Sequence, residues 1–367
     1  MRLMQGTVAV LAALWALGAC SPSEPVKIGY LGGMSGRGAD LGTAGRDGVL
    51  LAVEEVNAAG GINGRKVELT MIDDGQKSET ALQAVETFKK SGVDVIVGPM
   101  TSSIAEAILP SLQQHNLLAI SPTVAASSLT GQDDAFLKVA PSVPVYANLS
   151  AEYQYAQGRR KMALVADEGN KAFTGDWAHH FERRFKEIGG SVVASVTFKS
   201  GDDVSYTRAI EETATQNPDG FLLICNAVDT VRLNQILRNK GLQQAVAASS
   251  WAATEGFLQL GGRGVEGVNL VQFFDRADQS ARYTAFAAKF KERFRTDPGF
   301  ASIAAYDSAQ AVFQALRKGG AQPIKAALLT SGPYEGLQES WTFDRFGDSN
   351  RKARLTVVRD GAFQVVR

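Results

Sequence analysis

The stretch VKIGYLGGMSGRGADLGTAGRDGVLLAVEEVNAAGGINGRKVELTMI, residues 26–72, decides the fold class. Residues 26–31 form an apolar run typical of a strand, and residues 45–59 have the apolar spacing of an amphipathic helix that ends at two glycines. Residues 66–72 place Val67, Leu69 and Met71 on one face of a second strand. A strand, a helix and a strand in this order predict two parallel strands joined by a right-handed crossover.

The alternation continues along the chain and then starts again. The first series goes on with helices at 78–90 and 102–115 and strands at 93–97 and 117–120. After the turn-like Pro141-Ser142-Val143-Pro144, a second series has strands at 161–166, 191–198, 221–225 and 245–248 and helices at 175–188, 206–216 and 229–240. The remainder reads as helices at 281–294 and 303–318 and strands at 339–343, 354–359 and 362–366, with Asp360-Gly361 as a hairpin turn. The pattern predicts an α/β protein of two lobes, each a doubly wound parallel sheet.

The N-terminus has the pattern of an export signal. Arg2 precedes an apolar run at residues 8–17, which is too short for a membrane-spanning helix. The run ends in Leu17-Gly18-Ala19-Cys20, which resembles the lipobox of bacterial lipoproteins. We therefore expect residues 1–19 to be a lipoprotein signal peptide, Cys20 to be lipidated and residues 20–25 to be a tether. The alternative is an ordinary signal peptide with a chance cysteine.

Composition excludes several classes of protein. The chain has 38 Lys and Arg against 38 Asp and Glu without long blocks of one sign, so bulk electrostatics do not suggest nucleic-acid binding. With Cys20 lipidated, Cys225 has no intramolecular partner, and we expect it to be a buried, inert thiol. The histidines at 115, 179 and 180 fall on helical segments and are expected at the surface, and we expect no metal and no cofactor.

Two tandem lobes favour a ligand site in the crevice between them, at the carboxyl ends of the strands. Three loops that follow strands of the first lobe are rich in small and hydroxyl residues, namely 32–41, 98–103 and 121–128. Ser102 stands at the start of a predicted helix, where unpaired backbone N–H groups favour an anion. The alternative is that Ser102 only caps this helix.

Several motifs, in one order along nearly the whole mature chain, carry a family resemblance. They are Asn57-Ala58-Ala59-Gly60-Gly61-Ile62-Asn63-Gly64-Arg65, Asp73-Asp74, Gly98-Pro99 with Ser102, Ile120-Ser121-Pro122, Tyr306-Asp307 and Phe343-Asp344-Arg345-Phe346-Gly347-Asp348. Together they resemble the leucine/isoleucine/valine-binding family of periplasmic receptors. The resemblance implies a Venus-flytrap fold with three crossovers between the lobes, which we place near 140–143, 273–276 and 340–342. Lobe 1 would comprise residues 26–141 and 275–339, and lobe 2 residues 142–274 and 340–367.

The resemblance also implies which residues hold a ligand. In the family, a serine and the Ser-Pro loop grip the carboxylate of the ligand, and the matching positions here are Ser102, Thr123 and Ala125. Ala125 departs from the family's usual threonine and loses one hydroxyl contact. Further candidates on loops that follow strands are Ser103, Leu41, Phe173, Asn226 and Trp251. The alternative for Leu41, Phe173, Asn226 and Trp251 is packing between the lobes or in the local core.

Amino-acid binders of this family hold the α-ammonium with an acidic residue of the second lobe. No carboxylate occurs at Ser249-Ser250-Trp251, where we expect it. The nearby Asp167, Glu168, Asp229 and Glu255 fit helix-end or solvated charges better than an ammonium partner. An organic or aromatic acid without an ammonium therefore competes with an amino acid as the ligand.

The function that we expect is that of an extracytoplasmic, monomeric solute-binding lipoprotein, periplasmic or at the cell surface. It would bind a small carboxylate-bearing molecule, deliver it to the permease of an ABC importer, and have no enzymatic activity. One alternative is a sensor module that feeds a signalling partner. A hydrolase that uses Ser102 is the other alternative, but the sequence pattern offers no histidine or lysine base near this serine.

Overall fold

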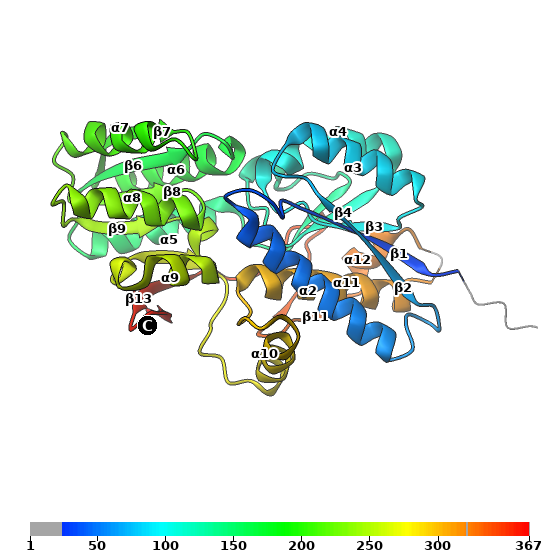
Figure 1. Cartoon of the computed structure of the whole chain (residues 1–367). Helices are drawn as coiled ribbons and strands as arrows, with labels where there is room; N and C mark the ends of the chain where they lie inside the picture. The colour runs from blue at the N-terminus through cyan, green and yellow to red at the C-terminus, as the bar shows by residue number, and fades with distance from the viewer. Residues whose placement is uncertain (1–23, 321, 367) are drawn as a thin grey trace, which may run out of the picture.

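Two lobes lie side by side in the computed structural model, which describes residues 24–320 and 322–366 (Figure 1). The expected signal peptide and the lipidation site Cys20 lie outside the described residues. Within the described ranges, no helix combines the length and the apolar character that crossing a bilayer requires.

The first lobe contains a parallel five-stranded sheet in the order β2-β1-β3-β4-β5. Its strands are β1 (Val26–Gly32), β2 (Val67–Asp73), β3 (Val95–Val97), β4 (Leu118–Ser121) and β5 (Phe136–Lys138). Helices α2 (Ala39–Ala58) and α11 (Phe300–Lys318) cover one face, and α3 (Ser78–Lys90) and α4 (Ser102–His115) cover the other. Each face has its own apolar cluster, because alternate residues of a strand point to opposite sides.

Three smaller parts complete the first lobe. Helix α10 (Ala281–Phe294) packs along α2, and α12 (Ile324–Thr330) packs on α11 (Figure 1). A short antiparallel pair joins β11 (Tyr334–Glu335) to β12 (Ser340–Trp341).

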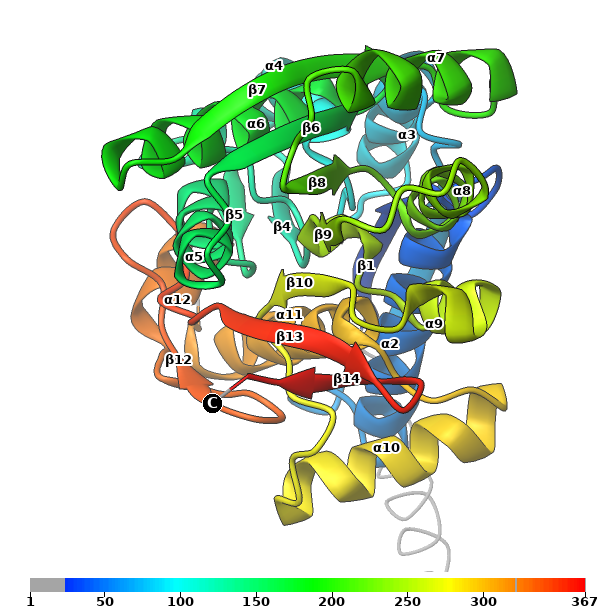
Figure 2. The same ribbon diagram turned by 90° about the vertical axis from the view of Figure 1, so that its left-hand side faces the viewer.

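The second lobe contains a seven-stranded sheet, which Figure 2 shows from its side. Its order is β14 (Ala362–Val365), β13 (Arg354–Arg359), β10 (Asn269–Gln272), β9 (Ala245–Ala248), β8 (Gly220–Ile224), β6 (Lys161–Asp167) and β7 (Ser191–Phe198). Its helices are α5 (Val143–Ala156), α6 (Lys171–Glu187), α7 (Asp203–Ala214), α8 (Ala227–Asn239) and α9 (Glu255–Gly261), and two short 3-10 turns are η2 (Ser250–Ala252) and η3 (Gly262–Val265). A third such turn, η1 (Ser127–Leu129), lies between β4 and β5 of the first lobe. The parallel strands are β7, β6, β8, β9 and β10, whereas β13 is antiparallel to both of its neighbours, β10 and β14. The expectation of two doubly wound lobes is confirmed.

Three segments connect the two sheets, and one of them lies later than we expected. The first runs from the end of β5 to α5, and the second runs from β10 to α10. Ser340–Trp341, where we expected the third, instead pairs with β11, and Asp348 still bridges to Lys138 at the edge of the first sheet. The chain enters the second sheet only at β13, so the third connection spans residues 349–353.

Cysteine and histidine burial tests two of the expectations from the sequence. Cys225 is fully buried, and this burial raises the pKa of its thiol well above the usual range, as expected for an inert thiol. His179 is exposed, but His115 and His180 are half-buried beside Glu86 and Asp176. The surface assignment was therefore wrong for these two residues, because their rings pack against carboxylates. His115 packs against Glu86 of α3, and His180 packs against Asp176 one turn earlier on α6.

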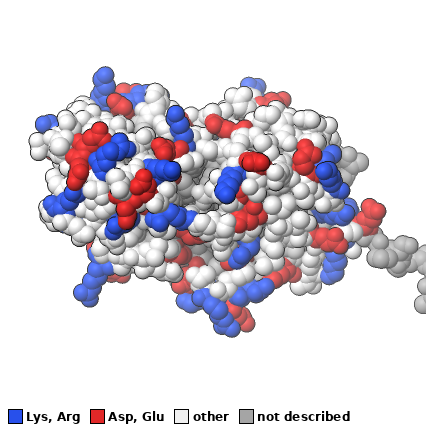
Figure 3. Space-filling model, turned by 45° about the horizontal axis from the view of Figure 1, so that its top comes forward, with Lys and Arg blue, Asp and Glu red and all other residues white. Residues whose placement is uncertain are grey.

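Acidic and basic side chains are interspersed on the face of the molecule shown in Figure 3. No large patch of one sign dominates this face. The picture agrees with the balanced charge of the sequence.

Candidate functional site

A narrow cavity lies between the two lobes, close to the start of α4. Its lining residues are Leu41, Met100, Thr101, Ser102, Thr123, Tyr146, Asn170, Phe173, Ser250, Trp251, Gln272, Phe273 and Phe300. The volume of about 20 Å³ is close to that of one water molecule. So little free space indicates that the lobes are closed over the cavity.

The N-terminus of α4 forms one wall of this cavity. Thr101 is the N-cap residue and Ser102 is the first helical residue, so Ser102 does not cap the helix. Ser102 is 2% exposed, and its Oγ accepts long hydrogen bonds from the backbone N–H groups of Ala125 at 3.4 Å and Ala126 at 3.3 Å. Two loop N–H groups, the serine hydroxyl and the N–H groups at the start of the helix therefore converge, an arrangement suited to a carboxylate.

A glycine brings the loop before α4 against β1. Gly98 has a φ of 122°, and a Cβ atom there would lie 2.1 Å from the carbonyl oxygen of Leu31. Only glycine accepts both the conformation and the contact. This close approach sets the position at which α4 begins.

The N-terminus of α6, in the second lobe, faces that of α4. The Ser103 backbone N–H donates to Oδ1 of Asn170 at 3.0 Å, and the Ala172 N–H donates to Oγ of Ser103 at 3.1 Å. Asn170 is the N-cap residue of α6, so each helix start supplies a partner for the other. Because both helix dipoles point their positive ends here, the potential at this end of the cavity favours an anion and disfavours a cation.

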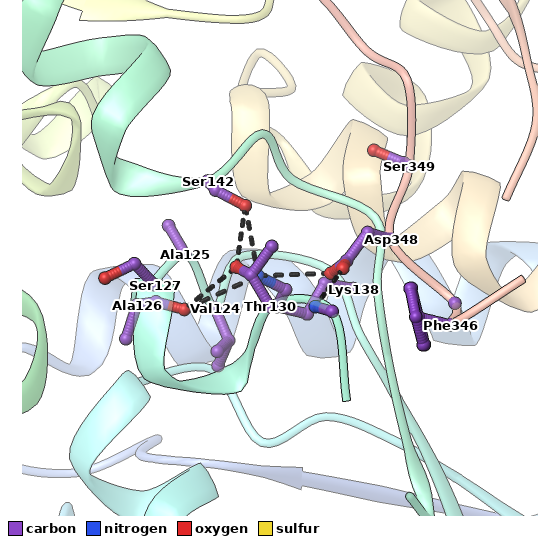
Figure 4. Close-up of polar contacts among 12 residues, drawn as sticks. Val124, Ala125, Ala126, Ser127, Thr130, Lys138, Ser142, Phe346, Asp348 and Ser349 are labelled. Carbon is purple, nitrogen blue, oxygen red and sulfur yellow. Dashed lines mark hydrogen bonds and ion pairs between the residues drawn. The ribbon is translucent and has the colours of Figure 1, made fainter. Parts of the chain in front are cut away.

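A buried lysine supports the loop that carries Ala125 and Ala126 (Figure 4). Lys138 is 1% exposed, and its Nζ contacts the Ala126 carbonyl oxygen at 3.4 Å, Ser142 Oγ at 3.1 Å and Asp348 Oδ1 at 3.2 Å. Burial lowers the pKa of Lys138, while the neighbouring Asp348 carboxylate raises it in part. This cluster ties the loop to the first connection between the lobes and to the chain just before the third.

Aromatic side chains form the rest of the cavity wall. Phe173 and Trp251 of the second lobe meet edge to face with ring centroids 6.1 Å apart. Phe273 and Phe300 form a second edge-to-face pair at 6.0 Å. With Leu41 opposite, these rings suit an apolar or ring-bearing ligand body.

Among the residues of the described ranges that line the cavity, none carries a charge. Asp167 accepts from the Gly169 N–H, and burial raises its pKa to about 6. Glu255 pairs with Arg276, and the fully buried Asp229 accepts from the hydroxyls of Ser200 and Tyr206. The expectation that these carboxylates are no ammonium partners agrees with this geometry, although Asp229 is not solvated.

Eight residues were expected to bind ligand, and the cavity brings five of them together. Leu41, Ser102, Thr123, Phe173 and Trp251 line it. Thr123 turns its hydroxyl to the Met100 carbonyl oxygen at 2.6 Å, while Ser103 and Ala125 lie one contact away. Asn226 is not among the lining residues, since its side chain caps α8 through the Asp229 N–H and also donates to the Asp229 carboxylate. We therefore assign Asn226 to helix capping.

The sequence did not suggest several of the lining residues. Most of these residues lie on helices or strands that the sequence pattern missed or predicted with a late start. Tyr146 lies on α5, Gln272 ends the short strand β10, and Phe300 begins α11 three residues before the predicted start. Asn170 precedes α6, which begins four residues earlier than expected. A proline at the first turn, as in α5, is a helix-start signal that could have revealed Tyr146.

Polar contacts across the cleft hold the lobes closed. Arg37, in the glycine-rich loop after β1, reaches Asp229 of the second lobe with Nε 3.1 Å from Oδ1. Two further pairs cross the cleft: Thr254 with Asp40, and Ser127 with Asp176. All these contacts form only when the lobes are closed, so they stabilise the closed form relative to the open form.

We expect Arg37→Ala to shift the unliganded protein towards open forms. The Arg37 side chain is 44% exposed, so the pair with Asp229 is worth at most about 1 kcal/mol. Small-angle scattering should show a larger radius of gyration, and ligand affinity should fall by up to about 5-fold. Arg208→Ala is the control, because Arg208 contacts Glu212 on its own helix and the Thr197 carbonyl oxygen of β7, both within the second lobe. Identical scattering from the two variants would show that the Arg37 pair does not hold the lobes.

Comparison with known proteins identifies a family with which this chain shares its sequence pattern. The model of a family described as periplasmic binding protein matches residues 25–362. The Leu/Ile/Val-binding protein BraC3 of Rhizobium johnstonii is 29% identical over 39% of this chain and 40% of the relative, so that alignment spans less than half of either protein.

Two solved structures agree with the fold over most of the chain. The branched-chain amino acid transporter substrate-binding protein LivJ of Streptococcus pneumoniae, in complex with isoleucine, superposes with a TM-score of 0.85 at 24% identity, covering 93% of this chain and 99% of the other. A solute-binding protein of an ABC transporter from R. palustris, in complex with benzoate, also gives a TM-score of 0.85, at 17% identity and with 93% and 95% coverage. At these identities the two structures establish the fold and leave the ligand open.

Proposed function

The chain belongs to the periplasmic binding protein family, and from this premise we propose that it is an extracytoplasmic solute-binding protein of an ABC importer whose ligand is a small carboxylic acid without an α-ammonium group. The acid would lie in the cavity between the lobes with its carboxylate at the start of α4. Lipidation of Cys20 would tether the protein near the permease, which raises its effective concentration there. We further propose that it acts as a monomer.

One observation carries the choice of ligand. The start of α4 and the start of α6 meet at the cavity, and none of its described lining residues is an Asp or Glu. A carboxylate would find N–H donors and two positive helix ends, whereas a desolvated ammonium would find no counter-charge. The edge-to-face aromatic walls favour a ring or a branched apolar body next to the carboxylate.

The contact between the lobes supports a receptor that closes on its ligand. Phe173, Trp251 and Gln272 come from the second lobe and face Ser102 and Leu41 of the first across the cavity. A ligand that touches both lobes stabilises the closed form, and three connecting segments allow a hinge motion. Closure of this kind provides a signal that a permease can read.

A thermal-shift screen with matched pairs of ligands tests the proposal. We expect carboxylic acids such as phenylacetate, 3-phenylpropanoate and 4-methylpentanoate to raise the melting temperature by about 5 °C at saturating concentration, because they bind only the folded form. Phenylglycine, phenylalanine and leucine, which add only the α-ammonium, should have little effect. The opposite ranking would show that an ammonium partner exists and would contradict the proposal.

A further inference from the structure

Two buried polar atoms of the second lobe remain unpaired at the cavity. Gln272 and Trp251 both line it, with exposed fractions of 1% and 6%. Neither Oε1 of Gln272 nor Nε1 of Trp251 has a hydrogen-bond partner among the residues described. Most buried polar groups in folded proteins are paired, so two unpaired atoms at one ligand cavity indicate a partner supplied by the ligand.

The Gln272 amide turns its NH₂ group towards Thr356 in the structure. Its Nε2 lies 3.3 Å from Oγ1 of Thr356, and the Thr356 hydroxyl lies 3.2 Å from the Leu270 carbonyl oxygen. With the Thr356 hydroxyl donating to Leu270, Thr356 accepts from Gln272. The NH₂ group of Gln272 therefore faces Thr356, and its Oε1 is left as a free acceptor.

The Trp251 indole supplies the complementary group. Its ring is held edge to face against Phe173, in the wall formed by η2 and the start of α6. An indole N–H can donate and cannot accept. Gln272 and Trp251 together offer one acceptor and one donor, the two roles that a hydroxyl group fills because it both donates and accepts.

We propose that the ligand carries a hydroxyl group remote from its carboxylate, and that Gln272 and Trp251 recognise this hydroxyl when the second lobe closes. The inference rests on the proposed function, since it places the carboxylate at Ser102 of the first lobe. The two polar ends of the ligand then contact different lobes, and the aromatic walls hold the body between them. The ligand class is thus a hydroxylated carboxylic acid, and a hydroxybenzoate is a suitable probe. An acid that lacks the hydroxyl would leave both buried atoms unpaired, which disfavours it.

The test is a calorimetric titration of the mature protein with benzoate, 3-hydroxybenzoate and 4-hydroxybenzoate. We expect the wild type to prefer at least one hydroxybenzoate over benzoate by about 10- to 100-fold. Gln272→Leu, which removes the acceptor, should reduce this preference at least about 10-fold. Trp251→Phe, which keeps an aromatic ring, should reduce the preference independently.

Gln154→Leu is the matched control. Gln154 is a fully buried amide of the same lobe whose two ends are paired with Asn269 and Arg159, and it does not line the cavity. This variant should keep the wild-type preference even if its melting temperature falls. Equal affinities for all three acids in the wild type, or a preference that survives in both cavity variants, would overturn the inference and leave the proposed function standing. Failure of all three acids to bind would contradict the proposed function as well.

Discussion

Ser102→Ala is expected to weaken binding of the best carboxylic acid by about 1 to 3 kcal/mol, which corresponds to about 5- to 150-fold in Kd. The Ser102 hydroxyl is buried at the start of α4 beside the N–H groups of Ala125 and Ala126. A ligand carboxylate would accept hydrogen bonds from this hydroxyl and from these N–H groups. A charged hydrogen bond lost from a buried site leaves the carboxylate partly unsatisfied. Isothermal titration calorimetry measures the change directly.

Ser78→Ala is the matched control for this variant. Ser78 is the first residue of α3, as Ser102 is of α4, but it is exposed and not a lining residue of the cavity. Its replacement should leave the Kd unchanged. A Ser102→Ala protein that binds as tightly as the Ser78→Ala protein would remove Ser102 from the site.

Ser250→Glu is expected to abolish measurable binding of simple carboxylic acids, with a loss of at least about 100-fold. Ser250 lines the cavity on the second lobe, so a glutamate there would add a negative charge to the same small, buried cavity that holds the ligand's carboxylate. Like charges placed together in an interface cost several kcal/mol. The same glutamate supplies the counter-charge that an α-ammonium lacks, so leucine and phenylalanine should gain affinity.

Ser250→Gln separates the effect of charge from the effect of size in this experiment. Glutamine has the length of glutamate without its charge, so it should reduce the affinity for acids by crowding alone and give no gain for amino acids. Binding constants for one acid and its matched amino acid in both variants give the comparison. If the Glu and Gln variants bind acids equally, the ligand carboxylate does not lie in the cavity that Ser250 lines and the site account is wrong.

The fold was predictable because its strongest signals are local. The helices α3, α4 and α10 and the strands β7, β9 and β13 have the bounds expected from the sequence, since each combines a clear apolar period with Gly, Pro or charged residues at its ends. Helix α5 was missed because Pro144 was interpreted as a boundary, although proline is favoured in a first helical turn. The third connection was placed too early because β12 has the apolar pattern of a sheet strand while pairing only with β11.

The site was predictable only in part, for a physical reason. Four lining residues follow strands or begin helices that the sequence pattern predicts, namely Ser102, Thr123, Phe173 and Trp251. The topology of the fold places such positions at one cleft. The positions of Gln272 and Asn170 in the cavity depend on how the two lobes meet. No local sequence pattern indicates that Asn170 contacts α4 or that the Gln272 oxygen has no partner. Asn226 has the sequence position of a binding residue, but a competing local interaction, the cap of α8, uses its side chain.

A crystal structure of the protein grown with its tightest-binding carboxylic acid tests the central claim most directly. We predict that both carboxylate oxygens lie within hydrogen-bonding distance of donors among Ser102 Oγ, the N–H groups at the start of α4 and those of Ala125 and Ala126, with Trp251 closed over the ligand body. A ligand found outside this cavity, or bound with its carboxylate turned towards the second lobe and away from α4, would contradict the account.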